Sequence, residues 1–239
     1  MKNGINVLSL FDGLSCGNIA LQRAGIKVNS YFASEVDKYA IQIANKNYPN
    51  IIQLGDVTKF DETKLPKIDL LIGGSPCQDL SFAGKGKGLI EGDRSSLFYQ
   101  YVRLLKECKP KYFLLENVRM KQEYQDIISD LLGVQPIKIN SSLVSGQNRV
   151  RLYWTNIPNV TQPEDKGILL KDILLDDAEE PMLSNIYGGF KEKKPRVHTD
   201  KSVTIRAASG GGAIPSIQLK QHTIMSEKFT SRNSQTGCL

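Results

Sequence analysis

The stretch Ile5-Asn6-Val7-Leu8-Ser9-Leu10-Phe11-Asp12-Gly13 decides the fold class of this chain. Its first six residues form a short apolar run, which is typical of a buried β-strand. Gly13 marks a turn, apolar residues from Ile19 to Ala24 then recur at helical spacing, and a second apolar run follows at 28–33. A strand, a glycine turn, a helix and a second strand are the first half of a nucleotide-binding sheet. We therefore expect an α/β protein with a Rossmann-like sheet.

The glycines and acids of this unit indicate a nucleoside ligand without a diphosphate. Gly13 and Gly17 are separated by three residues, so the middle glycine that lets backbone approach a pyrophosphate is missing. Glu35 lies near the spacing at which an acid meets a ribose hydroxyl. Asp56 follows a third predicted strand at 51–54, where it could accept from an adenine amino group. S-adenosylmethionine is the common ligand of this kind, although a purely structural glycine turn remains open.

A further apolar run, residues 68–72, leads directly into Gly73-Gly74-Ser75-Pro76-Cys77-Gln78. A cysteine just past a strand end, on a loop stiffened by Pro76, is well placed to act as a nucleophile. Residue type alone favours a different role for Cys77, because free cysteines are most often small buried hydrophobes. The glycine- and lysine-rich segment 79–93 that follows is expected to close over a substrate.

Charged side chains also follow the later strands. Glu116 comes directly after the apolar run 111–115, and the stretch 147–151, which contains Arg149 and Arg151, leads into the run 150–155. Alternation along a strand predicts that both arginines point to the same face. A thiol, a carboxyl group and guanidinium groups suit addition to an electron-poor ring whose nitrogen needs a proton, as methylation of cytosine carbon 5 requires. The sheet region contains no histidine, which disfavours a cysteine protease.

Composition and charge indicate the compartment and the kind of partner that this activity would have. No run approaches the length of a membrane span and no signal peptide is present, so we expect no membrane partner and a cytoplasmic protein with reduced thiols. The four cysteines have no metal-ligand spacing, and no metal is expected. The net charge of +6 arises in residues 186–239, which hold nine Lys or Arg and three Asp or Glu. This basic region suits a phosphate-backbone partner, although a solvated basic surface remains open.

Composition changes near residue 158. The 82 residues from 158 onward contain half of the prolines and the triple glycine 210–212, and their helical periodicity is poor. We predict a catalytic and cofactor-binding domain at residues 1–157 and an irregular, basic second lobe at 158–239.

Six motifs occur in an order that is typical of one family. They are Phe11-Asp12-Gly13 to Gly17, Ser34-Glu35-Val36-Asp37, Gly55-Asp56-Val57, Gly74-Ser75-Pro76-Cys77-Gln78, Glu116-Asn117-Val118 and Gln147-Asn148-Arg149-Val150-Arg151. With them, residues 5–157 resemble the DNA (cytosine-5) methyltransferase family, most closely its de novo branch and the phage and bacterial relatives of that branch. The resemblance implies a class I S-adenosylmethionine-dependent methyltransferase sheet, with residues 158–239 as part of a target-recognition lobe, and restriction-modification as an expected setting.

The resemblance also assigns roles to residues. Cys77 would be the nucleophile, Glu116 would bind cytosine N3, Arg151 would bind O2, and Arg149 would brace the pocket. Pro76 and Asn117 would shape it. The cofactor would contact Phe11 at the adenine, Glu35 at the ribose and Asp56 at the amino group, with further contacts from Asp12, Gly13, Gly17, Val36, Val57 and Ser75. Double-stranded DNA would be the partner, its cytosine flipped out of the duplex, and S-adenosylhomocysteine the product.

The chain departs from the family pattern after the recognition region. An Arg-x-Leu-Thr-x-x-Glu segment and a final Gly-Asn-Ser/Ala-Val stretch are expected there, and neither occurs. We therefore expect a truncated chain, or one half of a split enzyme whose C-terminal partner polypeptide supplies the rest. A tRNA cytosine-5 methyltransferase, an inactive binding module and a nicotinamide-binding enzyme remain open alternatives.

Overall fold

The computed structural model describes residues 4–76, 96–175, 178–184, 194, 196–204 and 216–219. Cys77, the 79–93 segment, the triple glycine 210–212 and residues 220–239 lie outside the described residues. The chain forms two compact units. The first unit comprises Met1–Ile139 and Arg151–Gln162, and the second comprises Asn140–Val150 and Pro163–Leu239. The domain boundary near residue 158 stays a prediction.

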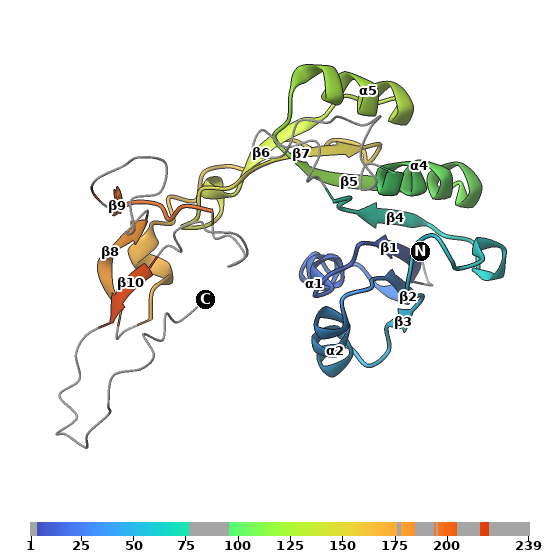
Figure 1. Cartoon of the computed structure of the whole chain (residues 1–239), viewed down its shortest axis with the longest axis horizontal. Helices are drawn as coiled ribbons and strands as arrows, with labels where there is room; N and C mark the ends of the chain where they lie inside the picture. The colour runs from blue at the N-terminus through green and yellow to red at the C-terminus, as the bar shows by residue number, and fades with distance from the viewer. Residues whose placement is uncertain are drawn as a thin grey trace. The chain divides into compact units, whose positions relative to one another are not determined.

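A seven-stranded sheet organises the first unit (Figure 1). Its strands are β1 (Ile5–Leu10), β2 (Val28–Ser34), β3 (Ile52–Gln53), β4 (Leu70–Gly73), β5 (Tyr112–Val118), β6 (Ile137–Asn140) and β7 (Val150–Thr155). The strand order is β3-β2-β1-β4-β5-β7-β6, with β1 to β5 parallel and β7 antiparallel to β5. The predicted fold class is confirmed as far as its architecture: this is an α/β, Rossmann-like sheet.

Helices connect the parallel strands. They are α1 (Cys16–Arg23), α2 (Lys38–Asn47), α4 (Ser96–Cys108) and α5 (Gln122–Leu132). Asp37 caps α2 by accepting from the backbone N–H groups of Tyr39 and Ala40, at 2.9 and 2.8 Å. Gly133 ends α5 with φ +71°, a conformation that favours glycine. The start of α2 and the end of α5 therefore have residue types that favour such boundaries.

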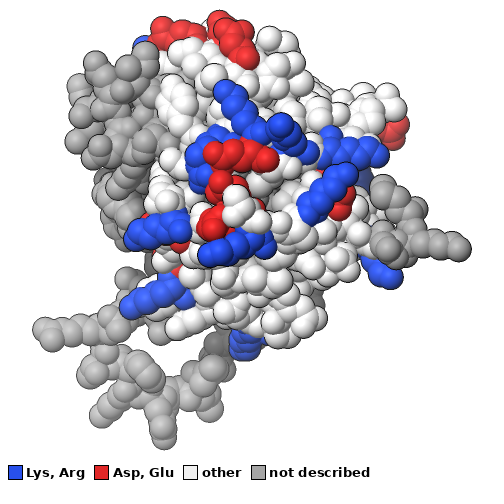
Figure 2. Space-filling view, turned by 90° about the vertical axis from the view of Figure 1, so that its right-hand side faces the viewer, with Lys and Arg blue, Asp and Glu red and all other residues white. Residues whose placement is uncertain are grey.

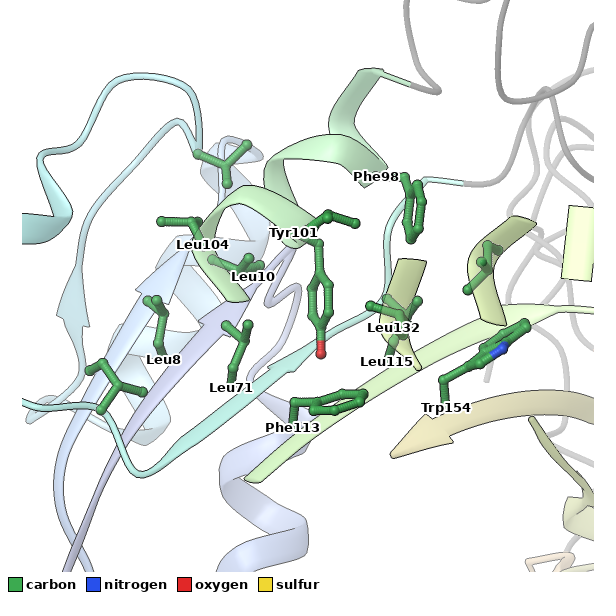
Figure 3. Close-up of a cluster of buried hydrophobic side chains, with 14 of the residues drawn as sticks. Leu8, Leu10, Leu71, Phe98, Tyr101, Leu104, Phe113, Leu115, Leu132 and Trp154 are labelled. Atoms are coloured by element: carbon green, nitrogen blue, oxygen red, sulfur yellow. The ribbon is translucent and has the colours of Figure 1, made fainter. Parts of the chain in front are cut away.

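The two sheet faces are packed by different helices. On one face, Phe98, Tyr101 and Leu104 of α4 pack with Leu8, Leu71 and Phe113 of the sheet, as Figure 3 shows. On the other face, Leu21 of α1 packs with Val7, Tyr31 and Leu70. Because successive strand residues alternate between faces, the neighbours Val7 and Leu8, Leu70 and Leu71, and Tyr112 and Phe113 belong to different clusters. The apolar runs of the sequence are thus strands buried on both sides, as parallel sheets require.

The strand register brings the predicted site residues to one edge. Leu10 pairs with both Ser34 and Gly73, and Gly73 pairs with Leu115. The next residue of each strand is therefore Phe11, Glu35, Gly74 or Glu116, all at the carboxyl edge of the sheet. Ligands bind at this edge in open α/β sheets.

Strand β5 is longer than its sequence pattern predicted. The apolar run ends at Leu115, and we expected Glu116 and Asn117 to follow the strand. In the structure β5 continues to Val118, because Glu116, Asn117 and Val118 pair with Tyr153, Leu152 and Arg151 of β7. Both site residues therefore lie in a paired strand, which holds them more firmly than a loop would.

The face of the first unit that carries α4 and η1 (Glu62–Lys64) bears mixed charges (Figure 2). Arg103 of α4 forms ion pairs with Glu62 at 3.0 Å and with Glu107 at 2.5 Å. Basic and acidic side chains are interspersed on this face, so it does not present a field of one sign.

The second unit contains a small antiparallel sheet. Its strands are β8 (Ala178–Ser184), β9 (Arg196–His198) and β10 (Ser216–Leu219), in the order β10-β8-β9. We expected irregular structure here, because residues 158–239 contain half of the prolines and have poor helical periodicity. Within the described ranges, this unit has 3-10 turns but no α-helix. None of the helices in the described part of the chain has the length and apolar character of a membrane-spanning segment.

Candidate active site

Glu116 and Arg151 form an ion pair at the carboxyl edge of the sheet. Arg151 Nε lies 2.7 Å from Glu116 Oε1, and the side chains of Arg151 and Glu116 are 14% and 33% exposed, respectively. The β5–β7 register explains the contact: Arg151 pairs with Val118, two residues after Glu116, so the two side chains are diagonal neighbours on one face. The structure thus joins two residues that are distant in sequence and were both predicted to bind the substrate ring.

Gly74 lets the loop that leads to Cys77 pass close to this pair. A Cβ atom at Gly74 would lie 3.1 Å from Glu116 Oε2. Asn117 holds the next residue, since its Nδ2 donates to Ser75 Oγ at 3.2 Å. Ser75 and Asn117 are only 4% and 2% exposed. Pro76 is the last described residue of the loop and Cys77 follows it, so the position of the thiol stays a prediction.

Arg149 belongs to the second unit, directly before β7. Its backbone N–H donates to Asn140 Oδ1 at 3.0 Å, and its carbonyl accepts from Ser141 N at 3.1 Å. Asn140 Nδ2 also donates to Asn148 Oδ1 at 2.7 Å. These bonds fix the backbone around Arg149, whose role in bracing the pocket stays a prediction.

The Asp12 side chain is held by three hydroxyl groups. Ser9 Oγ and Tyr31 OH donate to Oδ1 at 2.6 and 2.7 Å, and Ser15 Oγ donates to Oδ2 at 2.5 Å. Ser9, Ser15 and Tyr31 are at most 4% exposed. This half-buried carboxylate therefore already has several partners within the protein, and a contact of Asp12 with a cofactor stays a prediction.

The turn that Asp12 anchors has an unusual backbone. Phe11, Gly13 and Ser15 have φ values of +56°, +58° and +62°. Left-handed backbone is strained for a bulky residue such as Phe11, and such strain persists only where neighbours fix it. Burial, and secondarily the Asp12 carboxylate, raise the pKa of Tyr31 far above its ordinary value, so this hydroxyl keeps its proton and donates. The hydroxyl cluster thus stabilises a strained turn at the ligand-binding edge.

Glu35 connects the same turn to β2. Its Oε2 accepts from Gly13 N at 2.8 Å, and its Oε1 accepts from the backbone N–H groups of Val36 and Asp37 at 2.7 and 2.9 Å. The Glu35 carboxylate is therefore fixed beside the glycine turn. A carboxylate oxygen has two lone pairs, so Oε2 can accept a ribose hydroxyl in addition to Gly13.

The remaining predicted cofactor residues differ in their surroundings. Gly17 allows α1 to pack closely, because a Cβ atom there would lie 2.2 Å from Ile72 Cδ1 and 2.9 Å from Tyr31 OH. Val36 is 72% exposed, whereas Val57 is buried in the core. Bonds from the backbone and hydroxyl of Thr58 hold the pKa of Asp56 below its ordinary value. The cofactor contacts of all these residues stay predictions.

Sequence reasoning missed the three hydroxyl residues around Asp12. A signal was present, since Ser9 interrupts an apolar strand, and Ser9, Asp12 and Ser15 recur at intervals of three. Tyr31 gave no such signal, because tyrosine is common in strands. Only the pairing of β1 with β2 brings its hydroxyl to Asp12.

Comparison with known proteins supports one family. The family described as C-5 cytosine-specific DNA methylase matches residues 5–129, which is more than half of the chain. An orphan methyltransferase, M.SPRI of Bacillus phage SPR, is 39% identical over 166 residues, covering 64% of this chain and 38% of the relative. The orphan methyltransferase M.Rho11sI of Bacillus phage rho11s is 39% identical over 180 residues, covering 70% and 36%.

A bacterial relative gives the same result. The type II methyltransferase M1.ScrFI of Lactococcus lactis subsp. cremoris is 42% identical over 158 residues, covering 62% of this chain and 40% of the relative. The chain thus matches well under half of the length of these relatives. The family match includes β1 to β5 and the motifs from Phe11 to Glu116. By its sequence and its sheet, this chain belongs to the C-5 cytosine-specific DNA methylase family.

Proposed function

We propose that this protein transfers a methyl group from S-adenosylmethionine to carbon 5 of cytosine in double-stranded DNA, through a covalent adduct with Cys77. The Glu116–Arg151 ion pair at 2.7 Å carries the proposal. It joins a carboxyl group and a guanidinium group beside Gly74, three residues before Cys77. Each of these groups suits one atom of the cytosine ring. The expected compartment is the cytoplasm, where the thiol stays reduced.

The chain's own residues account for activation of the ring. The Cys77 thiolate adds to carbon 6, and the π electrons of the carbon 5–carbon 6 bond move toward carbon 5. Glu116 takes up a proton from solvent as the ring binds and donates it to N3, while Arg151 donates to O2, so charge on the ring is stabilised as it forms. After methylation a base removes the carbon 5 proton, the double bond re-forms and the thiolate leaves. Glu116 then regains its proton from N3.

The two oxygens of Glu116 have different neighbours, which suits a carboxyl group that contacts both Arg151 and the cytosine ring. Oε1 faces the Arg151 guanidinium, whereas Oε2 lies toward Gly74 and the loop that leads to Cys77. Arg151 therefore holds the carboxyl group in place through one oxygen. The other oxygen is on the side from which a ring bound to Cys77 would approach.

The residues at the carboxyl edge fit S-adenosylmethionine. A Cβ atom added to Gly13 would meet no other atom within 4 Å, so a ligand can approach the backbone of this turn. Oε2 of Glu35 lies beside the turn and suits a ribose hydroxyl. Phe11 offers an aromatic ring to the adenine. When bound, the cofactor supplies an electrophilic methyl group.

Access to the cytosine requires that the base leave the duplex, since a stacked ring cannot reach a thiolate. Residues 158–239 are the proposed target-recognition region. The chain matches 36 to 40% of the length of three relatives, so we propose that full activity needs a further segment or a partner polypeptide.

A trapping experiment tests the proposed function. A duplex containing 5-fluorocytosine blocks loss of the ring substituent, so with S-adenosylmethionine it should accumulate a covalent protein–DNA adduct. Cys77→Ser should abolish the adduct, whereas Cys108→Ser, which changes a free thiol at the end of α4 outside all six motifs, should leave it unchanged. Glu116→Gln should slow its formation by about 100-fold, the usual range for a lost acid catalyst. An adduct with tRNA but not with DNA would refute the DNA substrate.

A further inference from the structure

A second recess lies at the same end of the sheet as the candidate active site. It is a pocket of about 410 Å³ in the first unit, between α5 and the strands β6 and β7. Buried Met120 and Leu152 form its floor, and Arg119, Gln122 and Lys138 contribute polar groups to its walls. A volume of this size is typical of small-ligand sites.

The pocket has cationic walls and no acidic lining residue. Neither Arg119 nor Lys138 forms an ion pair with any residue in the described ranges. Of the nearest acids along the chain, Glu123 pairs with Lys121 at 3.3 Å, and Asp126 accepts from Nε2 of the wall residue Gln122 at 2.8 Å. Two cations that share one recess without a counter-charge favour an anionic ligand.

The pocket lies on the same strands, β5 and β7, as the residues that are proposed to bind the cytosine ring. Arg119 directly follows β5, three residues after Glu116, and the floor residue Leu152 pairs with Asn117. Alternation along β5 and β7 places Leu152 and Asn117 on one face, and Glu116 and Arg151 on the other. A nucleic acid that delivers a base to Glu116 must pass over these strand ends. Its backbone would then be within reach of the pocket on the opposite face.

We propose that this pocket binds a backbone phosphate of the DNA substrate. Arg119 and Lys138 pair with the phosphate oxygens, and the apolar floor of Met120 and Leu152 contacts the adjoining deoxyribose. Such contacts position a nucleic acid but do not read its sequence. The assignment rests on the proposed function, because it assumes DNA at this edge of the sheet.

The test is duplex binding over a range of salt concentrations. The double variant Arg119→Gln, Lys138→Gln is compared with Arg23→Gln, Lys46→Gln, which removes the same charge from the last turns of α1 and α2. We expect the pocket variant to bind a short duplex about tenfold more weakly. Its slope of log affinity against log salt should be smaller by about 1, as for one lost phosphate contact. Duplexes with and without cytosine should be affected equally, and thermal unfolding should be unchanged.

Three outcomes would overturn the assignment. Equal losses in the pocket and control variants would show only a general effect of charge. Inorganic phosphate that binds the wild-type pocket, with duplex affinity unaffected in the pocket variant, would assign the pocket to a free anion. If the wild-type chain binds S-adenosylmethionine but no duplex, both this inference and the DNA substrate are refuted. If the wild-type chain forms the covalent adduct but the pocket variant binds the duplex as tightly as the wild type does, only this inference is refuted.

Discussion

Three hydroxyl groups converge on the carboxylate of Asp12, so the side chain of Asp12 has a structural role in the glycine turn. Asp12 belongs to a motif that predicts cofactor binding, yet its side chain faces Ser9, Ser15 and Tyr31. These bonds hold the left-handed backbone of Phe11 and Ser15. The effect of Asp12 on a bound cofactor would therefore be indirect, through the shape of the turn.

Removal of one hydroxyl should weaken both the fold and cofactor binding. Tyr31→Phe deletes a partly buried hydrogen bond to a carboxylate, and bonds to charged groups typically contribute about 1.5–3 kcal/mol to the free energy of unfolding. We expect a loss in that range by denaturant unfolding, and weaker S-adenosylmethionine binding by calorimetry. Tyr39→Phe is the matched control, because Tyr39 is 63% exposed. Unchanged cofactor affinity in a destabilised Tyr31 variant would limit the cluster to a structural role.

The same tyrosine predicts a pH dependence with a definite sign. Burial and Asp12 raise the pKa of Tyr31 in the folded state above its unfolded value of about 10. The neutral hydroxyl therefore stabilises the fold at every pH below about 10, and this stabilisation is lost as the pH rises further. The stability difference between wild type and Tyr31→Phe should be constant from about pH 7 to 9 and decrease above about pH 10. A difference that grows in alkali would contradict this.

At the scale of elements, close packing of α1 against the sheet depends on Gly17. A Cβ atom at this position would lie 2.2 Å from Ile72 Cδ1, so Gly17→Ala should cost about 1–3 kcal/mol by overpacking. The cost should outweigh the higher helix propensity of alanine, which is worth about 1 kcal/mol. Chemical denaturation provides the measurement. In an Ile72→Val background, which removes the Cδ1 atom, the same substitution should cost less, and equal costs in both backgrounds would exclude this clash as the cause.

In the second unit, Lys201 holds the turn that precedes β7. Its Nζ donates to the carbonyl oxygens of Ser142 at 2.7 Å and Ser145 at 3.2 Å, and also to that of Ile168. The adjoining Ser202 N donates to Gly146 O, and Ser202 O accepts from Asn148 N, at 2.7 and 2.8 Å. One ammonium group thus organises the backbone that leads to Arg149.

Loss of this ammonium group should loosen the turn locally. Lys201→Met keeps most of the side chain but leaves three carbonyl groups without their donor. We expect the amide hydrogens of Asn148 and Ser202 to exchange about tenfold faster or more, since 1.4 kcal/mol of local stability corresponds to a factor of ten. Lys171→Met, at an exposed position in η3 (Leu170–Ile173), is the control. Equal exchange in both variants would contradict the proposed anchoring.

The strand pattern predicted most of the sheet, but not the length of β5. Apolar runs revealed β1, β2 and β4, because strands buried on both faces need apolar residues at every position. Glu116 and Asn117 are polar, and their place in β5 depends on pairing with β7. Glu116 and its ion-pair partner Arg151 are 35 residues apart in the sequence. The same limitation applies to the contact of Tyr31 with Asp12. Local patterns reveal which residues a site contains, whereas long-range pairing decides what those residues contact.

At the scale of the whole molecule, the chain has a built-in reporter for one of its two units. Trp154 is the only tryptophan, is fully buried, and donates to Ser129 Oγ at 3.0 Å. It lies in the first unit, which also contains every residue predicted to bind the cofactor. Its fluorescence therefore follows unfolding of the first unit alone.

Cofactor binding should stabilise the first unit in this assay. At 100 times the dissociation constant, S-adenosylmethionine should add about 2.7 kcal/mol to the free energy of unfolding, seen as a higher midpoint of the Trp154 fluorescence transition. S-adenosylhomocysteine should have a similar effect, and NAD should have none. A shift with NAD but not with S-adenosylmethionine would contradict the assigned cofactor.

Insertion of β7 beside β5 has a consequence for synthesis of the protein on the ribosome. The chain emerges from its N-terminus, so β1, β2, β4 and β5 are complete before Arg151 exists. Until β7 is made, β5 is the outer strand of a growing sheet, with backbone groups exposed to other nascent chains. Glu116 meets its arginine only when this strand docks. Docking of β7 thus covers the open edge of β5 and completes the Glu116–Arg151 ion pair in a single event. A nascent chain that lacks β7 has neither the covered edge nor the ion pair.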